Sequence, residues 1–140
     1  MRPKIVVVFY HPKDPANVED MKRVVEDLNG DLLIIPRKGI LEDHPNAVSL
    51  EEAIARISVC KKILLETYGF ERLDDVNLEC GKCIAIIVGA EDYGVPPVVG
   101  EKFSPDAIAR IPMAVEGMSY NVVSAVVMAL AEIAYKCRST

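Results

Sequence analysis

The sequence predicts a single α/β domain, residues 1–140, with a largely parallel sheet and helices on both faces. Three observations support this prediction. Continuous apolar runs, such as IVVVFY at residues 5–10, are typical of strands buried on both faces. Segments with apolar residues at helical spacing separate these runs, and this alternation favours parallel strand pairing. With 51% hydrophobic and 26% charged residues, the chain has enough apolar side chains to form one core.

The N-terminal part predicts a strand, a helix and a second strand. The first strand is expected at residues 4–10, and the amphipathic helix after it begins at Asn17, a favoured N-cap residue. Gly30 stands where a helix C-terminal cap belongs. The second strand, Asp31–Ile35, is stopped by Pro36, because proline lacks the N–H that a strand ladder needs.

The middle of the chain predicts a loop at residues 36–48 and then a helix. Ser49 and Glu52 have the spacing of a capping box, and the helix is expected to end near Gly69. Its apolar face would consist of Ile54, Ile57, Cys60 and Leu64. Residues 70–82 are polar, and their pattern leaves this segment unassigned.

The C-terminal part predicts a central strand at residues 83–88 and a short strand at 107–111. Prolines and a glycine interrupt the segment between them. The last helix, residues 121–136, is apolar nearly all round. One row is Val122, Val126, Ala129 and Ile133, and another is Val123, Val127, Leu130 and Ala134. Such a helix is buried on more than one side, so we expect one face to cover the sheet and the other to contact a second subunit in a homodimer.

Charge and hydropathy limit the possible partners and the location. The net charge of −5 argues against strong nonspecific nucleic-acid binding but allows RNA to be held by a local basic patch. The candidate pairs for this patch are Lys22-Arg23, Arg37-Lys38 and Lys61-Lys62. No apolar run approaches the roughly 20 residues that span a bilayer, and the N-terminus reads as a strand rather than a signal peptide. We therefore expect a cytoplasmic protein without a membrane segment.

The four cysteines allow three interpretations. Cys80 and Cys83 have the spacing of half a zinc site, but no second Cys-x-x-Cys or paired histidine completes it, so no metal site is predicted. A disulfide or redox pair between Cys80 and Cys83 is the second interpretation. Ordinary thiols leading into a strand are the third, and we favour them.

Three short clusters carry the chemistry. Residues 89–94, GAEDYG, follow the central strand, and ligands of open parallel sheets bind beyond the carboxyl ends of strands. Residues 111–113 and 119–122 flank the start of the last helix, where free backbone N–H groups can bind a ligand. Asn17 and Arg23 form the third cluster. Taken singly, each has an ordinary explanation as a tight turn, a helix cap or a surface ion pair.

Together and in order, these clusters resemble the SpoU-type RNA methyltransferases of the SPOUT class. The matching motifs are Pro15-Ala16-Asn17-Val18 with Arg23, Gly89-x-Glu91-x-x-Gly94, Ile111-Pro112-Met113 and Ser119-Tyr120-Asn121-Val122. The resemblance is tight over residues 86–135 and looser over 14–35. This chain departs from the family pattern at Ala90, where the family usually has Asn, and at Tyr120, where it usually has Leu.

The resemblance implies a C-terminal trefoil knot that binds S-adenosyl-L-methionine, and a homodimer with active sites near the interface. The implied cofactor-binding residues are Gly89, Ala90, Glu91, Gly94, Ile111, Met113 and Val122. The implied reaction is methylation of a ribose 2′-hydroxyl of tRNA or rRNA. Its catalytic side would consist of Arg23, Asn17, Glu91, Ser119 and Asn121, with Arg23 contacting the hydroxyl or an adjacent phosphate.

Two other functions remain open at this point. One is a knotted dimer that binds RNA or a nucleoside without catalysis, which the acidic charge and Ala90 favour. The other is a metal-dependent nuclease built on Glu79, Glu91 and Asp92, which requires the three carboxylates to converge.

Overall fold

The computed structural model describes residues 3–111 and 121–138. Its centre is a six-stranded sheet in the order β2-β1-β5-β3-β6-β4, and every strand pair is parallel. The strands are β1 (Ile5–Tyr10), β2 (Asp31–Ile35), β3 (Lys61–Leu65), β4 (Glu71–Arg72), β5 (Ile84–Val88) and β6 (Ala107–Arg110). The predicted α/β class with a parallel sheet is therefore confirmed.

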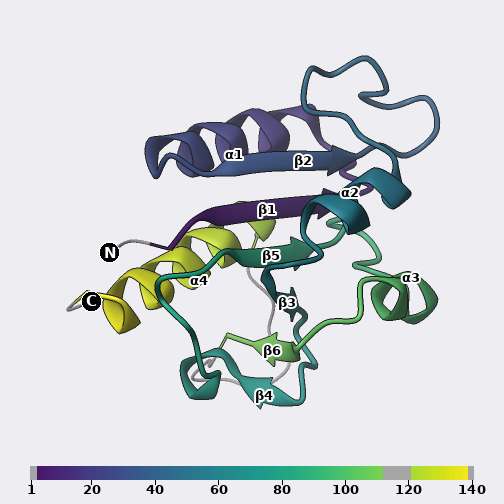
Figure 1. The fold of residues 1–140 in the computed structure, drawn as a ribbon. Coiled ribbons are helices and arrows are strands. Elements are labelled where there is room, and N and C mark those ends of the chain that lie inside the picture. Colours follow the sequence, from purple (N-terminus) through teal and green to yellow (C-terminus); the bar gives the residue numbers. More distant parts are fainter. Residues whose placement is uncertain (1–2, 112–120, 139–140) are drawn as a thin grey trace.

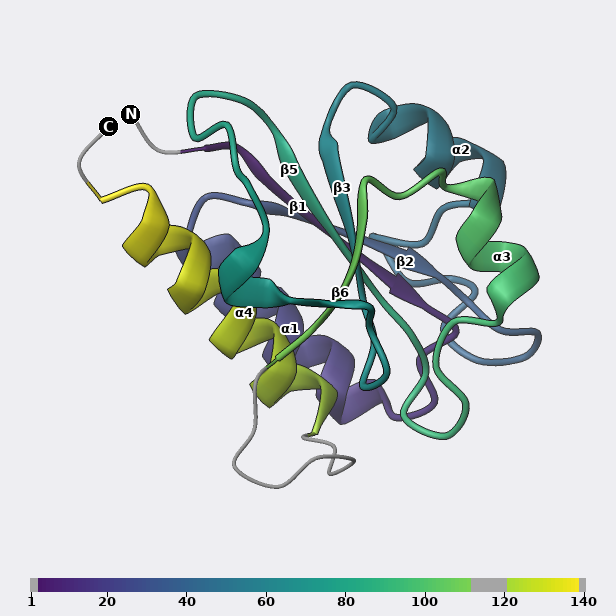
Figure 2. The same ribbon diagram turned by 90° about the horizontal axis from the view of Figure 1, so that it is seen from below.

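The helices cover both faces of the sheet, as Figures 1 and 2 show. They are α1 (Pro15–Asp27), α2 (Leu50–Arg56), α3 (Pro97–Lys102) and α4 (Val122–Lys136), with a short 3₁₀ turn η1 (Leu73–Asp75) after β4. α1 and α4 pack side by side over one face, where Val18, Met21 and Val126 are fully buried. α2 and α3 pack on the other face through Ile57 and Phe103. The alternating side chains of the buried strands fill both layers.

The start and end of α1 differ from the prediction. Asp14, not Asn17, is the N-cap, and its side chain accepts a hydrogen bond from the Ala16 N–H at 2.9 Å. Pro15 occupies the first helical position, where its fixed φ and missing N–H cost nothing. Asn29 (φ 57°), not Gly30, takes the left-handed conformation that ends the helix.

The predicted helix from Ser49 to near Gly69 is wrong beyond its first half. Ser49 does cap α2, accepting the Glu52 N–H at 3.0 Å, but α2 ends at Arg56. Residues 61–65 form β3, which lies between β5 and β6 in the sheet. Burial in that position overrides the helical spacing of Cys60 and Leu64. The proline-rich segment, predicted to be irregular, contains α3 with Pro97 in its first turn.

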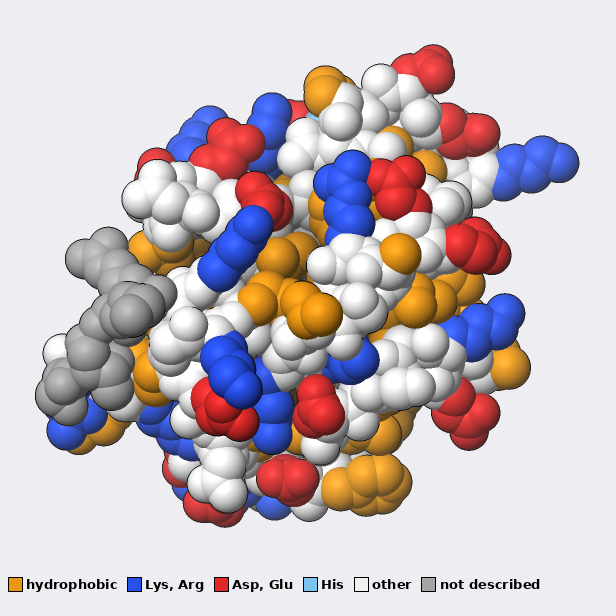
Figure 3. All heavy atoms as spheres, in the orientation of Figure 1, with side chains coloured by type: hydrophobic (Ala, Val, Ile, Leu, Met, Phe, Trp, Pro, Cys, Tyr) orange, Lys and Arg blue, Asp and Glu red, His pale blue; other side chains and the backbone are white. Residues whose placement is uncertain are grey.

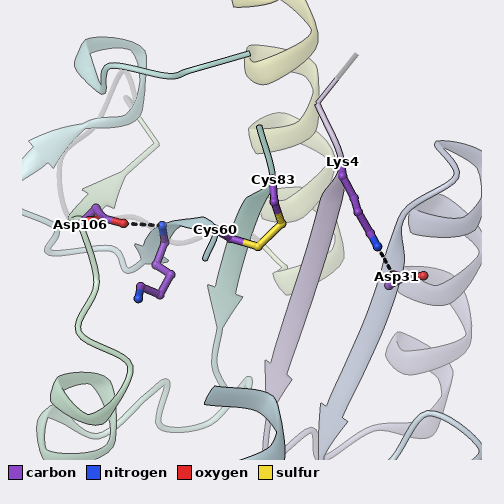
Figure 4. Close-up of a disulfide and its surroundings, with 6 residues drawn as sticks. Lys4, Asp31, Cys60, Cys83 and Asp106 are labelled. Carbon is purple, nitrogen blue, oxygen red and sulfur yellow. Dashed lines mark hydrogen bonds and ion pairs between the residues drawn. A yellow bond between two sulfur atoms is a disulfide. The ribbon is translucent and has the colours of Figure 1, made fainter. Parts of the chain in front are cut away.

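All four cysteines form disulfides, Cys60–Cys83 and Cys80–Cys137, so the preference for ordinary thiols was wrong. The pairing of Cys80 with Cys83 was wrong as well. Cys60–Cys83 joins the entries to β3 and β5, as Figure 4 shows. Cys80–Cys137 joins the loop before β5 to the end of α4. Both disulfides lie at the amino edge of the sheet.

α4 has the predicted extent and begins at its N-cap Asn121, whose side chain accepts the Val123 N–H at 2.9 Å. Of its predicted second row, Leu130 is in the core, whereas Val127 is 43% exposed. No helix in the described part of the chain is long and apolar enough to cross a membrane.

Candidate functional site

A cavity of about 450 Å³ opens at the carboxyl edge of the sheet. It is lined by residues 65–68 at the end of β3, residues 88–94 at the end of β5, Ile111 after β6, and three residues at the start of α4. This is where ligands of parallel sheets bind, and the volume falls within the ~300–1,000 Å³ typical of small-molecule sites. The cavity therefore is the candidate ligand site.

The loop after β5 folds back on itself to form one wall of the cavity. The Gly94 N–H donates to the Ala90 carbonyl at 2.8 Å, and Gly94 has a φ of +68° that favours glycine. A Cβ on Gly89 would lie 2.1 Å from the carbonyl carbon of Gly94, so only glycine fits there. The two glycines of the sequence motif are thus explained by backbone geometry, and they bring the backbone close to any ligand in the cavity.

Glu91 connects this loop to the start of α1. Its carboxylate accepts hydrogen bonds from the backbone N–H of Lys13 at 3.1 Å and of Asp14 at 3.0 Å. The side-chain amide of Asn17, 74 residues away in sequence, donates to the same carboxylate at 3.0 Å. The N-terminal and central motifs are therefore brought into direct contact.

These donors govern the pKa of Glu91. Burial by itself would raise this pKa, but the donors of residues 13–17 and the backbone N–H of Glu91 outweigh burial and hold it below its ordinary value. A carboxyl whose pKa is depressed by folding stabilises the protein above its unfolded pKa, and this stability is lost as pH falls through the folded pKa.

Glu91→Gln is therefore expected to lower the free energy of unfolding by about 1 kcal/mol at pH 7, because an amide binds these donors less strongly and Glu91 is exposed to solvent. The difference should shrink below about pH 4, where the wild-type carboxyl also becomes neutral. Urea midpoints of both proteins from pH 7 to pH 3 measure this. A constant difference across that range would contradict it.

A second polar cluster connects the loops after β1, β2 and β5. The guanidinium of Arg37 donates to both carboxylate oxygens of Asp92, at 3.2 and 2.9 Å, and twice to the His11 carbonyl, at 3.1 and 2.7 Å. It also lies over the ring of Tyr93, 5.0 Å from the centroid, and the Tyr93 hydroxyl is 2.8 Å from His11 Nδ1. Hydrogen bonding to Arg37 holds the pKa of Asp92 below its usual value. Burial, helped by the nearby Arg37, lowers the pKa of His11.

Most of the sequence-predicted site residues line the cavity. These are Gly89, Ala90, Glu91, Gly94, Ile111, Asn121 and Val122. Asn17 joins them through Glu91. Met113 and Ser119 lie outside the described residues. Arg23 lies on α1, is exposed, and is not among the residues that line the cavity. It forms no ion pair with a described residue, so its interpretation as one half of a surface ion pair was wrong.

Sequence reasoning missed several side chains that shape the site. Glu66 and Tyr68 line the cavity, and Arg37 and His11 support its loops. All four follow the carboxyl end of a strand, which is the signal that could have identified them. Glu66 and Tyr68 were hidden by the incorrect extension of α2.

The sheet topology separates candidate basic pairs from one another and separates Glu79 from the other candidate nuclease carboxylates. Lys61 and Lys62 begin β3, whereas Arg37 follows β2, so these pairs lie at opposite edges of the parallel sheet and cannot form one patch. On the face shown in Figure 3, basic and acidic side chains are interspersed. Glu79 precedes β5 and pairs with Lys82 at 2.9 Å, far from the loop of Glu91. The described residues contain no group of His, Cys, Asp or Glu able to hold a metal ion, so the carboxylates that a nuclease needs do not converge.

Comparison with known proteins shows similarity at the level of fold. No family model matches the chain, and no curated protein sequence matches it. Among solved structures, it is similar to the SpoU methyltransferase AviRb from Streptomyces viridochromogenes in complex with AdoMet, with a TM-score of 0.80 and 18% identity over 99% of this chain and 60% of AviRb. The AdoMet-bound rRNA methyltransferase from Sinorhizobium meliloti gives a TM-score of 0.76 and 17% identity over 97% of this chain and 59% of that one.

A third structure, which concerns the 2-OH methylation of C/U34 on tRNA, gives a TM-score of 0.71 and 20% identity over 96% of this chain and 94% of that chain. The chain thus matches almost the whole of this protein and about 60% of the two larger ones. Similarity at this level of identity establishes the shared fold: this chain has the fold of the SpoU methyltransferases.

Proposed function

We propose that this chain is an S-adenosylmethionine-dependent RNA methyltransferase that modifies a ribose 2′-hydroxyl of tRNA or rRNA. The observation that carries the proposal is the contact between Asn17 and Glu91 beside the cavity. It joins two motifs that are far apart in sequence, at the ligand-binding edge of a fold shared with AdoMet-bound methyltransferases.

The cavity fits the cofactor. Leu65, Val88, Ile111 and Val122 give it an apolar wall suited to a purine ring. The loop of Gly89 and Gly94 lets backbone groups approach the ligand closely, where a Cβ on Gly89 would overlap the chain. The cofactor supplies a methyl group on a sulfonium, which is already electrophilic.

The residues of this chain have the tasks of aligning donor and acceptor and helping to remove the hydroxyl proton. Glu91 and Asn17 fix the start of α1 against residues 89–94, which we call the cofactor loop, and this contact sets where α1 places Arg23. A guanidinium keeps its proton in proteins, so we assign Arg23 to orienting the hydroxyl or a neighbouring phosphate and stabilising charge. Ser119 and Asn121 would complete the acceptor side.

We also propose that the chain forms a C-terminal trefoil knot and assembles as a homodimer. The outer face of α4 supports the dimer, since Val127 and Tyr135 are 43% and 61% exposed beside the exposed Ala131 and Ala134. Apolar helix faces of this kind are typical of subunit interfaces. Sedimentation equilibrium should give twice the 15.4 kDa chain mass, and Val127→Lys should shift the population to monomer. Monomeric wild-type protein at micromolar concentration would contradict this.

We further propose a cytoplasmic location, where tRNA and rRNA are processed. Disulfides are rare in the cytosol of mesophiles but common in that of hyperthermophiles. A cytoplasmic protein with two disulfides therefore requires a cytosol in which disulfides persist, as in hyperthermophiles.

Incubation with methyl-labelled S-adenosylmethionine and bulk RNA tests the function. Label should enter RNA, and nuclease digestion should release it as a 2′-O-methylnucleoside. A labelled base would instead move the acceptor from ribose to base. Cofactor binding by calorimetry without any incorporation would favour the non-catalytic RNA-binding dimer, which the apolar Ala90 in the cofactor loop makes the second candidate.

A further inference from the structure

Among the described residues, three carboxylates line the cavity, and two of them already have hydrogen-bond partners. Glu91 accepts three hydrogen bonds from residues 13–17, and Asp92 is paired bidentately with Arg37. Glu66 differs from both. Its Oε1 accepts the Val95 N–H at 3.0 Å, whereas its Oε2 has no hydrogen-bond partner among the described residues.

Glu66 is held firmly in place at the wall of the cavity. It directly follows β3, and its backbone N–H donates to the Ala109 carbonyl at 2.9 Å, which extends the pairing of β3 with β6. Its side chain lies against the cofactor loop, because a Cβ on Gly94 would be 3.2 Å from Oε2. The position of the carboxylate is therefore set by two strands and by the loop.

The environment of Glu66 favours a hydrogen-bond donor from a ligand. The side chain is half-buried, and burial raises its pKa although the Val95 N–H opposes this effect. A partly desolvated carboxylate oxygen gains when a donor replaces the water it has lost. On the same wall of the cavity, burial and, secondarily, the neighbouring Glu66 carboxylate raise the pKa of Tyr68.

We propose that Glu66 binds the ribose of the cofactor, with Oε2 accepting a hydrogen bond from a sugar hydroxyl; the inference rests on the proposed function. The ring nitrogens N1, N3 and N7 of adenine are acceptors, which a carboxylate does not bind. The hydroxyls are donors, and a carboxylate beside glycine-rich phosphate- and sugar-binding loops binds ribose in the same manner in dinucleotide sites. The apolar wall of Val88, Ile111 and Val122 leaves the polar side, around Glu66 and Gly94, for the sugar.

Calorimetry with S-adenosylhomocysteine, the stable reaction product, tests the assignment. Glu66→Gln keeps an oxygen for the Val95 N–H and replaces Oε2 with an NH₂ group, so the loop should stay intact while Kd rises about tenfold to a hundredfold. Glu101→Gln on α3, outside the cavity lining, is the matched control and should leave Kd unchanged.

Ligand analogues distinguish direct contact from a structural role. The probes are the 2′-deoxy and 3′-deoxy forms of S-adenosylhomocysteine. Removal of the hydroxyl that Glu66 binds should weaken binding to the wild-type protein at least tenfold. The same removal should weaken binding to Glu66→Gln by less than threefold. Equal penalties in both proteins would overturn the inference. So would a penalty that appears only when the 6-amino group is removed instead, because that result would assign Glu66 to adenine. Failure of the wild-type protein to bind S-adenosylhomocysteine would overturn the proposed function itself.

Discussion

Arg23→Ala is expected to lower the rate of methyl transfer to RNA by at least about a hundredfold, the loss typical of removing one charge-stabilising donor from an active site. The Kd for S-adenosylhomocysteine should stay within about twofold, because Arg23 is not among the residues that line the cavity. The fold should be unaffected too, since the side chain is exposed and makes no hydrogen bond or ion pair with a described residue. Initial rates with labelled cofactor and bulk RNA, together with calorimetry, measure both effects.

Two further variants make this test specific. Arg23→Lys keeps the charge but loses the planar fork, so it should retain a small part of the activity. Arg56→Ala removes an exposed arginine of α2, on the other face of the sheet, and should leave the rate unchanged. Full activity in Arg23→Ala would remove Arg23 from the mechanism. A large rise in Kd would make it a cofactor-binding residue instead.

Much of the fold was predictable because local and global preferences agree in most elements. β1 and β5 are continuous apolar runs, as is β2 after Asp31, and burial on both faces of a parallel sheet requires such runs. α4 combines a strong N-cap, Asn121, with an apolar face that the sheet needs. Where one interpretation satisfies both the local and the global requirement, the sequence specifies the element.

The errors in secondary structure arose where a short apolar pattern fitted both a helix and a buried strand. Ile57, Cys60 and Leu64 fit a helix, yet Ile63, Leu64 and Leu65 are also a buried strand. Only the pairing of β3 with β5 and β6 decides between them, and that pairing is non-local. The error hid Glu66, which follows β3 directly.

The site was predictable as a set of residues but not as a network. The glycines of residues 89–94 have a local cause in the turn they form. The role of Asn17 does not: its sequence context suggests a helix cap, and the contact with Glu91 exists only because β1 and β5 are neighbours in the sheet. Cysteine pairing is non-local in the same sense, since four cysteines allow three connectivities.

Replacing Cys80 and Cys137 together with alanine is expected to lower the free energy of unfolding by about 4 kcal/mol. The disulfide closes a separation of 57 residues, and the entropy that such a closure removes from the unfolded chain corresponds to this value. For a chain of this size the change lowers Tm by roughly 10–20 °C. Thermal melts and urea titrations of the double variant and the wild type measure it.

The matched control is the pair Cys60→Ala and Cys83→Ala, which opens a separation of 23 residues and should cost about 3 kcal/mol. Both disulfides lie at the amino edge of the sheet, whereas the cavity lies at the carboxyl edge. α4 joins the two edges: Val122 and Ala125 in its first turn line the cavity, and Cys137 ties its end to the loop before β5. At a temperature where every variant is folded, Kd for S-adenosylhomocysteine should therefore change little in either double variant. If loss of Cys80–Cys137 alone weakened binding, the disulfide would be holding the first turn of α4 in position, and its effect would not be confined to the unfolded chain.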